Sequence, residues 1–396
     1  MEAYVLEWLN LLMRWLHLIA GIAWIGASFY FVMLDNSLSP PARADDAQRG
    51  VFGELWAVHG GGFYVSQKFR TGPKGEPLST NLHWSKWEAY TTWLSGMGLL
   101  ALIYWLGARA YLIDNSVMPL GPGVAIVVSV AFLAGGLLVY EILCRMLEGR
   151  DTVLAVVLFA FIVASTWALF QLFSARAAYI HVGAMIGTMM VANVFFHIIP
   201  GQKKMVADIR AGREPDPRPG IIGKQRSVHN TYFTLPVLFT MISNHYPMTY
   251  SHPHGWLILA VIMLAGVLIR QFFVLRHRGN VKWALPAAGV ALLAAVAVAI
   301  APKVADPSGS KVTFASVESV MAERCLPCHS AHPTQAGFAQ PPKGIVLETP
   351  EQIAANAPKV AETVGNRYMP IGNLTQMTDG ERALITTWFA QGAVTR

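Results

Sequence analysis

Residues 154–173, LAVVLFAFIVASTWALFQLF, decide the fold of this chain. The stretch contains no charged side chain. About 20 consecutive apolar residues form a helix that crosses a hydrocarbon core of roughly 30 Å, and a helix satisfies all of its own backbone hydrogen bonds there. The stretch therefore predicts a transmembrane helix.

Similar apolar stretches lie on both sides of it. Of the 396 residues, 54% are hydrophobic and only 13% are charged, whereas a soluble domain has about 25% charged residues. The spans predicted in this way, of which the sixth is short and polar, are 11–34, 89–108, 121–144, 154–173, 179–199, 231–246, 256–275 and 283–300. We therefore expect an all-α fold in which residues 1–300 form a polytopic bundle of about eight transmembrane helices.

Lysine and arginine residues gather after the first, third, fifth and seventh predicted spans. Positive residues accumulate in short cytoplasmic loops, so the net charge of +7 indicates topology and not nucleic-acid binding. If the sixth stretch spans the bilayer, both termini lie outside the cytoplasm. We expect a multi-pass protein of the bacterial inner membrane, surrounded by lipid, with its C-terminal part in the periplasm.

That C-terminal part contains Cys325-Leu-Pro-Cys328-His329. This is the attachment motif of haem c, in which the two thiols form thioethers and the imidazole becomes an axial iron ligand. A zinc site or a redox dithiol is disfavoured, because the chain has no second Cys pair and its third cysteine, Cys144, stands alone. One covalent haem c is therefore predicted.

The surrounding sequence is typical of a small all-α cytochrome c domain at 311–396, joined to the bundle by a flexible linker at 301–310. Met369 is the expected sixth ligand, since a thioether opposite His favours electron transfer. A helix is predicted over 314–324, and Thr378-Asp-Gly-Glu381 predicts a capping box that starts a terminal helix.

Histidines within the predicted spans are functional candidates, because ionisable groups are costly in a membrane. They are His17, His181, His197 and His245. His17 shares a helix face with Gly21, which would leave room for a haem b, and Gly183 and Gly187 predict close helix packing. Haem b ligation and hydrogen bonding between helices both stay open as interpretations. His181 and His197 stand about 24 Å apart along one helix, so they cannot bind one metal.

The whole chain resembles the bacterial cytochrome c-coupled membrane urate oxidases, also called urate hydroxylases. The resemblance rests on the order of several segments, which are Arg14-Trp-Leu-His17-Leu-Ile-Ala-Gly-Ile-Ala-Trp24-Ile-Gly26, Leu34-Asp35-Asn36-Ser37, Trp56-Ala-Val-His59-Gly-Gly-Gly-Phe63-Tyr64, residues 181–204, Asn230-Thr-Tyr-Phe233 and the fused haem motif.

The resemblance implies that the bundle oxidises urate to 5-hydroxyisourate and that electrons pass through haem c towards a soluble cytochrome c or a terminal oxidase, without peroxide. Binding an anionic purine needs cationic or donor groups, an aromatic face and a base. The candidates for these roles are Arg14, His17, His59, Phe63, Tyr64, His181 and Asn193. The alternative is a membrane-anchored haem b/c electron-transfer subunit of a quinol-linked or other dehydrogenase.

Overall fold

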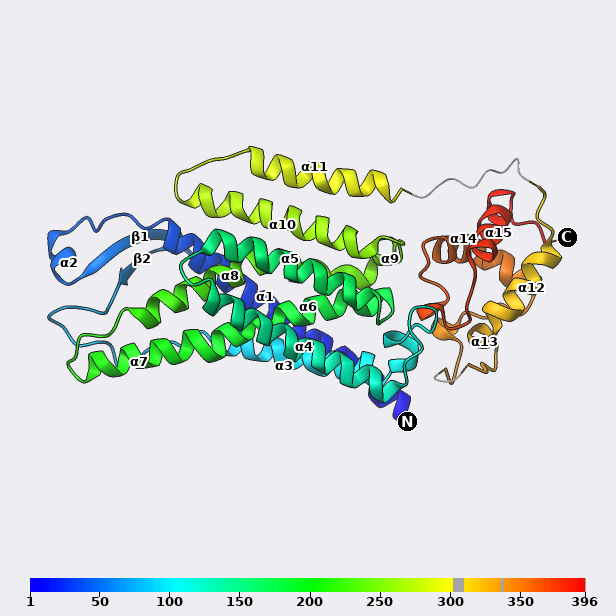
Figure 1. Cartoon of the computed structure of the whole chain (residues 1–396), viewed down its shortest axis with the longest axis horizontal. Coiled ribbons are helices and arrows are strands. Elements are labelled where there is room, and N and C mark those ends of the chain that lie inside the picture. The colour runs from blue at the N-terminus through cyan, green and yellow to red at the C-terminus, as the bar shows by residue number, and fades with distance from the viewer. Residues whose placement is uncertain (302–309, 336–337, 396) are drawn as a thin grey trace.

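The computed structural model describes residues 1–301, 310–335 and 338–395. Long helices run side by side in one bundle, and a second, smaller helical body lies against one end of it (Figure 1). The predicted linker, 301–310, lies almost entirely outside the described residues.

Within the described residues, five helices are long and apolar enough to cross a membrane. One of them is a continuous helix of 36 residues built from α6 (Ala175–Ala192), the π-helical turn η3 (Asn193–Ile198) and α7 (Ile199–Arg210). The others are α1 (Glu2–Asn36), α4 (Pro122–Met146), α5 (Asp151–Phe170) and α10 (Gly255–His277).

The other three predicted spans also fall on helices, although a count of eight membrane crossings stays a prediction. They correspond to α3 (Trp87–Leu99) with its π-helical continuation η1 (Leu100–Trp105), to α8 (Arg218–Ile242) and to the short apolar α11 (Ala284–Ala299). The helix that contains the sixth predicted span begins at Arg218, more than three turns before residue 231. The first half of α8 is polar because side chains such as Arg226 face polar partners inside the bundle.

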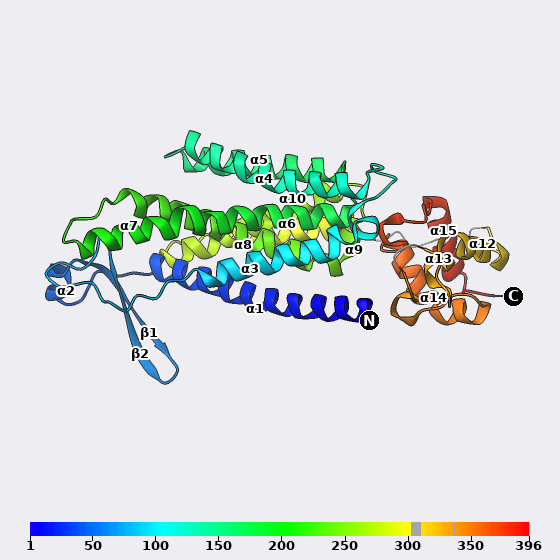
Figure 2. The ribbon, with the colours of Figure 1, turned by 90° about the horizontal axis from the view of Figure 1, so that it is seen from below.

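The all-α prediction is wrong for the long loop between the first two spans. There β1 (Val51–His59) and β2 (Gly62–Phe69) form an antiparallel hairpin, which projects away from the bundle (Figure 2). The signal is local, because Gly60 and Gly61 both adopt positive φ (59° and 81°) between runs of β-forming residues. A two-residue turn with two positive φ angles is the favoured hairpin connection. A short helix, α2 (Ala44–Gln48), precedes the hairpin.

Helix α6 forms the centre of the bundle, between α4, α5 and α8. Its side chains Tyr179, Met185 and Ile186 are fully buried. The predicted close packing is confirmed at Gly183, where an added Cβ would collide with Thr240 of α8, but it is wrong at Gly187, which has open space around its Cα. Short segments connect the helices at the end nearest the smaller body, namely η2 (Ala108–Leu112), η4 (Ser243–His245) and α9 (Pro247–Tyr250).

The smaller body is a separate cluster of helices with its own apolar core. The helix predicted over 314–324 is confirmed as α12 (Phe314–Arg324), and the predicted capping box between Thr378 and Glu381 starts α15 (Asp379–Ala390). Trp388 of α15 packs against Phe314. The body also contains α13 (Leu326–His329), η5 (Pro342–Gly344), α14 (Pro350–Gly365), which the sequence did not predict, and η6 (Ile371–Asn373).

Candidate functional site

The Cys-x-x-Cys-His motif forms a single helical turn. The backbone N–H groups of Cys328 and His329 both donate to the carbonyl of Cys325, at 3.1 and 2.8 Å. The turn therefore places both thiols and the imidazole close together. The Nδ1 of His329 lies 2.9 Å from the carbonyl oxygen of Ile345, to which it donates as N–H. This bond fixes the tautomer and leaves Nε2 free to bind iron.

Met369 lies at the edge of the same apolar core as Cys325 and Leu326. Its N–H donates to the Thr363 carbonyl at 2.9 Å. Its own carbonyl accepts a 2.6 Å hydrogen bond from Arg382, which also donates to the Val364 carbonyl at 3.0 Å. The loop that carries the predicted sixth ligand is thus held by a buried guanidinium.

The chemistry of the two thiols fits a haem attachment better than a redox dithiol. Burial raises the pKa of Cys325 to about 12, and burial also raises the pKa of Cys328. Disulfide exchange needs a thiolate, and burial disfavours that form of both cysteines. Together with the free Nε2 of His329, the donor set fits a c-type haem.

A second polar site lies inside the bundle, where α4, η3 and α8 meet. Glu141 accepts a hydrogen bond from Arg226 at 3.0 Å. The Nε2 of His197 lies 3.0 Å from the same carboxylate. Asn193 links this ion pair to Tyr140 and Asn230, at 2.8 Å each. Tyr140 in turn lies 2.8 Å from Nδ1 of His229.

This network brings together two of the residues predicted as candidates, Asn193 and His197. Both lie on η3, and π-helical turns in a helix occur frequently at functional sites. Their partners Glu141, Arg226 and Tyr140 were not predicted, because they come from helices far away in the sequence. This linked polar set, in which the Nε of Arg226 has no partner among the described residues, can hold a proton or order a polar ligand.

The remaining histidine candidates lie in different places. His181 is fully buried, with Nε2 2.6 Å from the Ser129 hydroxyl and Nδ1 2.8 Å from the Ala177 carbonyl. Both ring nitrogens are therefore engaged. His17 is held by α3, with Nδ1 3.0 Å from the Thr92 carbonyl, and the glycine that makes room for its ring is Gly96, not the predicted Gly21.

Three of the predicted candidates lie on the hairpin. His59, Phe63 and Tyr64 are exposed at its tip, at the end of the bundle that is opposite the smaller body (Figure 1). Arg14 is exposed on α1 and bonds to Asn10 at 2.5 Å, and His245 is exposed in η4. The structure does not gather these residues with the buried candidates. Among the described residues, no group of three or more His, Cys, Asp or Glu side chains could hold a metal ion.

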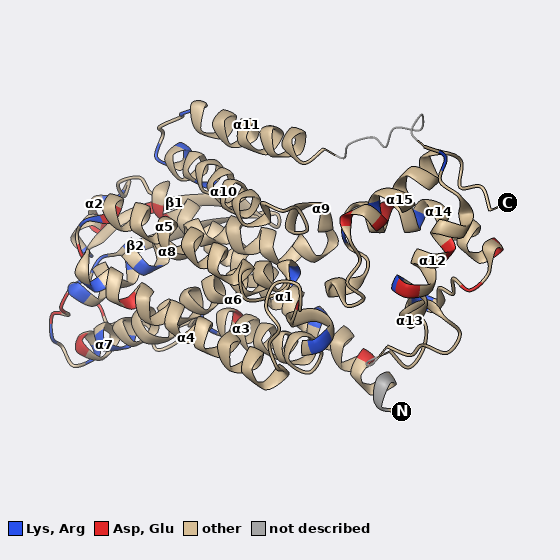
Figure 3. Cartoon of the chain, turned by 45° about the vertical axis from the view of Figure 1, so that its right-hand side comes forward, with Lys and Arg blue, Asp and Glu red and all other residues tan. Residues whose placement is uncertain are grey.

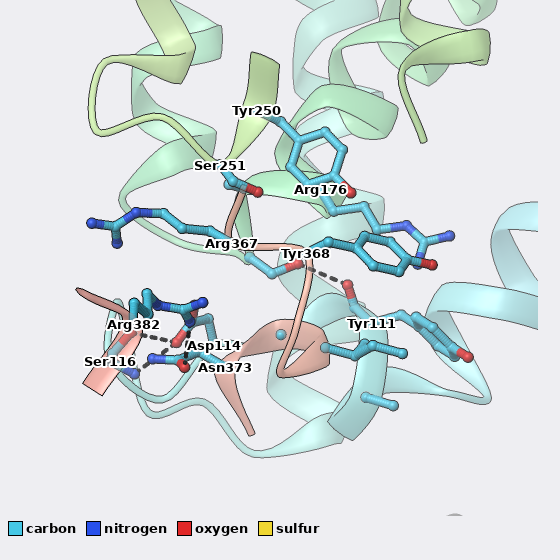
Figure 4. A pocket seen from close by; sticks show the side chains of 15 residues that line it. Tyr111, Asp114, Ser116, Arg176, Tyr250, Ser251, Arg367, Tyr368, Asn373 and Arg382 are labelled. Carbon is cyan, nitrogen blue, oxygen red and sulfur yellow. Dashed lines mark hydrogen bonds between the residues drawn. The ribbon is translucent and has the colours of Figure 1, made fainter. Parts of the chain in front are cut away.

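A pocket of about 160 Å³ lies where the smaller body meets the bundle, and we refer to it as the junction pocket. Figure 4 shows Arg176, Tyr250 and Tyr111 of the bundle on one side and Arg382 and Asn373 of the smaller body on the other. Tyr368, the neighbour of Met369, reaches between them. The complete lining is Ala110, Tyr111, Asp114, Ser116, Ser174, Ala175, Arg176, Tyr250, Ser251, Arg367, Tyr368, Ile371, Gly372, Asn373 and Arg382.

A family model described as urate oxidase N-terminal matches residues 3–301, which is the whole bundle. The chain belongs to this family. It is therefore related to urate oxidases and is an oxidoreductase of a small purine substrate. Neither a curated protein nor a solved structure matches the chain.

Sequence reasoning about this urate oxidase-related protein missed the residues of the junction pocket as a site. Arg176 does carry a signal, since it lies at the end of the bundle where few positive residues are found. An arginine that departs from the charge pattern of its side is a candidate for a functional role. Tyr250 offered no such signal, because it lies in a short connecting segment far away in the sequence.

Proposed function

We propose that this protein is a membrane-bound urate oxidase that passes electrons to a haem c carried on the same chain. The observation that carries the proposal is the arrangement of the two bodies. A bundle of the urate oxidase N-terminal family packs, at one end, against a body with a Cys-x-x-Cys-His turn whose histidine is oriented for iron. The reaction is urate plus water to 5-hydroxyisourate, with release of two electrons and two protons.

Haem c would be held by thioethers to Cys325 and Cys328 and by the axial ligands His329 and Met369. When bound, the haem supplies a one-electron acceptor, so each urate requires two successive transfers. The protein orients the His329 imidazole through Ile345 and holds the Met369 loop through Arg382. A soluble cytochrome c or a terminal oxidase is the proposed next acceptor.

The membrane assignment is supported by the exposed apolar surface of the bundle. Helix α1 exposes large side chains along its length, among them Trp8, Trp15 and Ile22 at 48%, 63% and 64%. Contiguous apolar surface of this extent marks contact with lipid or protein. Basic residues gather at the end of the bundle away from the smaller body (Figure 3). Because positive loops face the cytoplasm, we place the smaller body in the periplasm of a bacterial inner-membrane protein.

A haem b in the bundle is not part of the proposal. His181 would have to give up its bond to Ser129 or to Ala177 before it could bind iron. The contacts within the bundle fit the hydrogen-bonding interpretation of that histidine.

The test is an anaerobic visible spectrum of the purified full-length protein before and after urate is added, with the haem types counted by pyridine haemochrome. Urate alone should convert the c-type spectrum to its reduced form. A protein without covalent haem would contradict the haem assignment. A haem that stays oxidised with urate but is reduced by a quinol would contradict the urate assignment and favour the dehydrogenase subunit.

A further inference from the structure

We infer that the junction pocket is the binding site of the urate anion, and that Arg176 and Tyr250 are its principal polar contacts. The inference rests on the proposed function and adds the location of the substrate. Three features of the pocket carry it: a cation that lacks a carboxylate partner among the described residues, a buried hydroxyl that lacks any partner among them, and aromatic side chains in the lining.

Arg176 provides the positive charge. Its Nε donates to the amide oxygen of Asn244 at 2.9 Å, and its guanidinium lies 5.2 Å from the centre of the Tyr111 ring. Among the described residues it forms no ion pair, whereas Arg367 pairs with Asp379 at 2.6 Å. Arg382 uses its Nη atoms on two carbonyls and on Asn373. Arg176 is therefore the guanidinium left for an anion.

Tyr250 provides an unused donor. Its side chain is buried, at 4% exposure, and its hydroxyl has no hydrogen-bond partner among the described residues. A buried hydroxyl without a partner is costly. Figure 4 shows it on the same side of the pocket as Arg176. A ring carbonyl or deprotonated nitrogen of urate beside Arg176 would accept from this hydroxyl.

The shape and the walls fit a flat purine. A space of about 160 Å³ is smaller than the roughly 300–1,000 Å³ of sites for drug-sized ligands. Tyr368 offers an aromatic ring to a planar ligand, and the ring of Tyr111 lies beside the Arg176 guanidinium in the same wall. The one carboxylate in the lining, Asp114, lies on the opposite side beside Ser116 and Arg382, so it does not neutralise Arg176.

The position of the pocket agrees with electron transfer to the second body. Tyr368 precedes Met369, the proposed axial ligand, so the pocket touches the loop that holds the iron. Haem c would take up the two electrons released per urate one at a time and pass them to the external acceptor, and both protons would leave to solvent.

The experiment uses the full-length holoprotein with its haem reduced beforehand by dithionite, so that urate binds without turning over. Calorimetry then gives the Kd for urate. We expect Arg176→Gln to raise the Kd about tenfold or more and Tyr250→Phe to raise it several-fold, because hydrogen bonds to a charged ligand are lost. Arg176→Lys keeps the charge and should have an intermediate effect. Arg109→Gln is the matched control, since it is exposed at the same end of the bundle and does not line the pocket.

The other outcomes are distinct. If the wild-type protein oxidises urate and the Arg176 and Tyr250 variants bind it as tightly as the control, the location is wrong and the proposed function stands. If the wild-type protein neither binds nor oxidises urate, the proposed function itself fails. If the Arg176 variants shift the haem reduction potential and leave the Kd unchanged, the guanidinium serves a haem propionate, and the inference is overturned.

Discussion

At the scale of single residues, Arg382 connects the two ends of the loop around Met369. Its side chain is buried, at 7% exposure, and donates to the carbonyls of Val364 and Met369 and to Asn373. One guanidinium thus holds both Val364, the last buried residue of α14, and Met369, the proposed iron ligand. Arg382 is a positioning residue for Met369 and not an iron ligand.

Arg382→Ala should weaken the ligation of iron by Met369. The change leaves the Met369 carbonyl without its donor and removes one of the two donors to the Val364 carbonyl, at a cost of about 2 kcal/mol in the free energy of unfolding. A mispositioned thioether also lowers the reduction potential, since methionine opposite histidine raises it. Potentiometry and carbon monoxide binding by the reduced haem measure the effect, because an open sixth position binds the gas.

Lys359→Ala, an exposed change on α14, is the control for charge removal. Arg382→Lys restores the charge without the planar fork that spans two carbonyls, so it should recover only part of the potential. An Arg382→Ala protein with an unaltered potential and no carbon monoxide binding would show that the loop holds Met369 without this arginine.

The sequence predicted the residues whose chemistry is local. The spacing of Cys325, Cys328 and His329 within one turn needs no tertiary information, and neither does the capping box at Thr378. Arg176 and Tyr250 could not be paired from sequence, because they come from separate helical elements that meet only in the folded bundle. Their significance depends on missing partners, which a sequence does not show.

At the scale of secondary-structure elements, the pair between α4 and α8 holds the polar interior of the bundle together. Arg226 is almost fully buried, at 4% exposure, and its salt bridge to Glu141 measures 3.0 Å. His197 of η3 shares the same carboxylate. Three elements therefore depend on one negative charge.

Glu141→Ala should destabilise the protein by about 3 kcal/mol, because it leaves the Arg226 charge buried without its partner. The measurement is thermal unfolding in detergent, followed by circular dichroism. The double change Glu141→Leu with Arg226→Met should recover much of the loss, since two apolar side chains replace a buried ion pair with little penalty.

Glu148→Ala is the matched comparison within the same pair of helical segments. Its salt bridge to Arg218 measures 3.8 Å between exposed side chains, and such pairs contribute about 0–1 kcal/mol. Equal losses for Glu141→Ala and Glu148→Ala would mean that the buried network does not stabilise the bundle.

Within the bundle, prediction of the elements succeeded where the chain is apolar and missed elements where it is polar. The cores of α4, α5 and α10 follow directly from hydropathy. The polar half of α8 was not predicted, because this part of the helix is stabilised by contacts with α4 and η3. Hydropathy does not measure such contacts. The hairpin was not predicted either, although its turn, Gly60-Gly61, is a local signal. A prediction based on the length of apolar stretches alone overlooks two-residue turns.

At the scale of the whole molecule, the end of the bundle against which the smaller body packs also carries both the start of α1 and the end of α11 (Figure 1). The exposed apolar surface of α1 and the basic residues at the opposite end (Figure 3) support the orientation in the bilayer that we propose. In the orientation that we propose, the junction pocket and the smaller body share the periplasmic side, and the network around Glu141 lies nearer the cytoplasm.

This orientation predicts the outcome of reporter fusions made in a bacterial host. Alkaline phosphatase, which is active only in the periplasm, should be active when fused after Thr395 or within the segment at Ser251. Green fluorescent protein, which fluoresces only when folded in the cytoplasm, should be bright at Gly212, between α7 and α8. The reason is the positive-inside bias of the loops.

The fusion at Ser251 decides whether α8 spans. Its 25 residues reach about 37 Å as a helix, enough to cross although its first half is polar. Active phosphatase at Ser251 together with fluorescence at Gly212 requires the crossing. Fluorescence at both positions would mean that α8 stays on the cytoplasmic side, and the junction pocket, with Tyr250 in its wall, could then not face the periplasm.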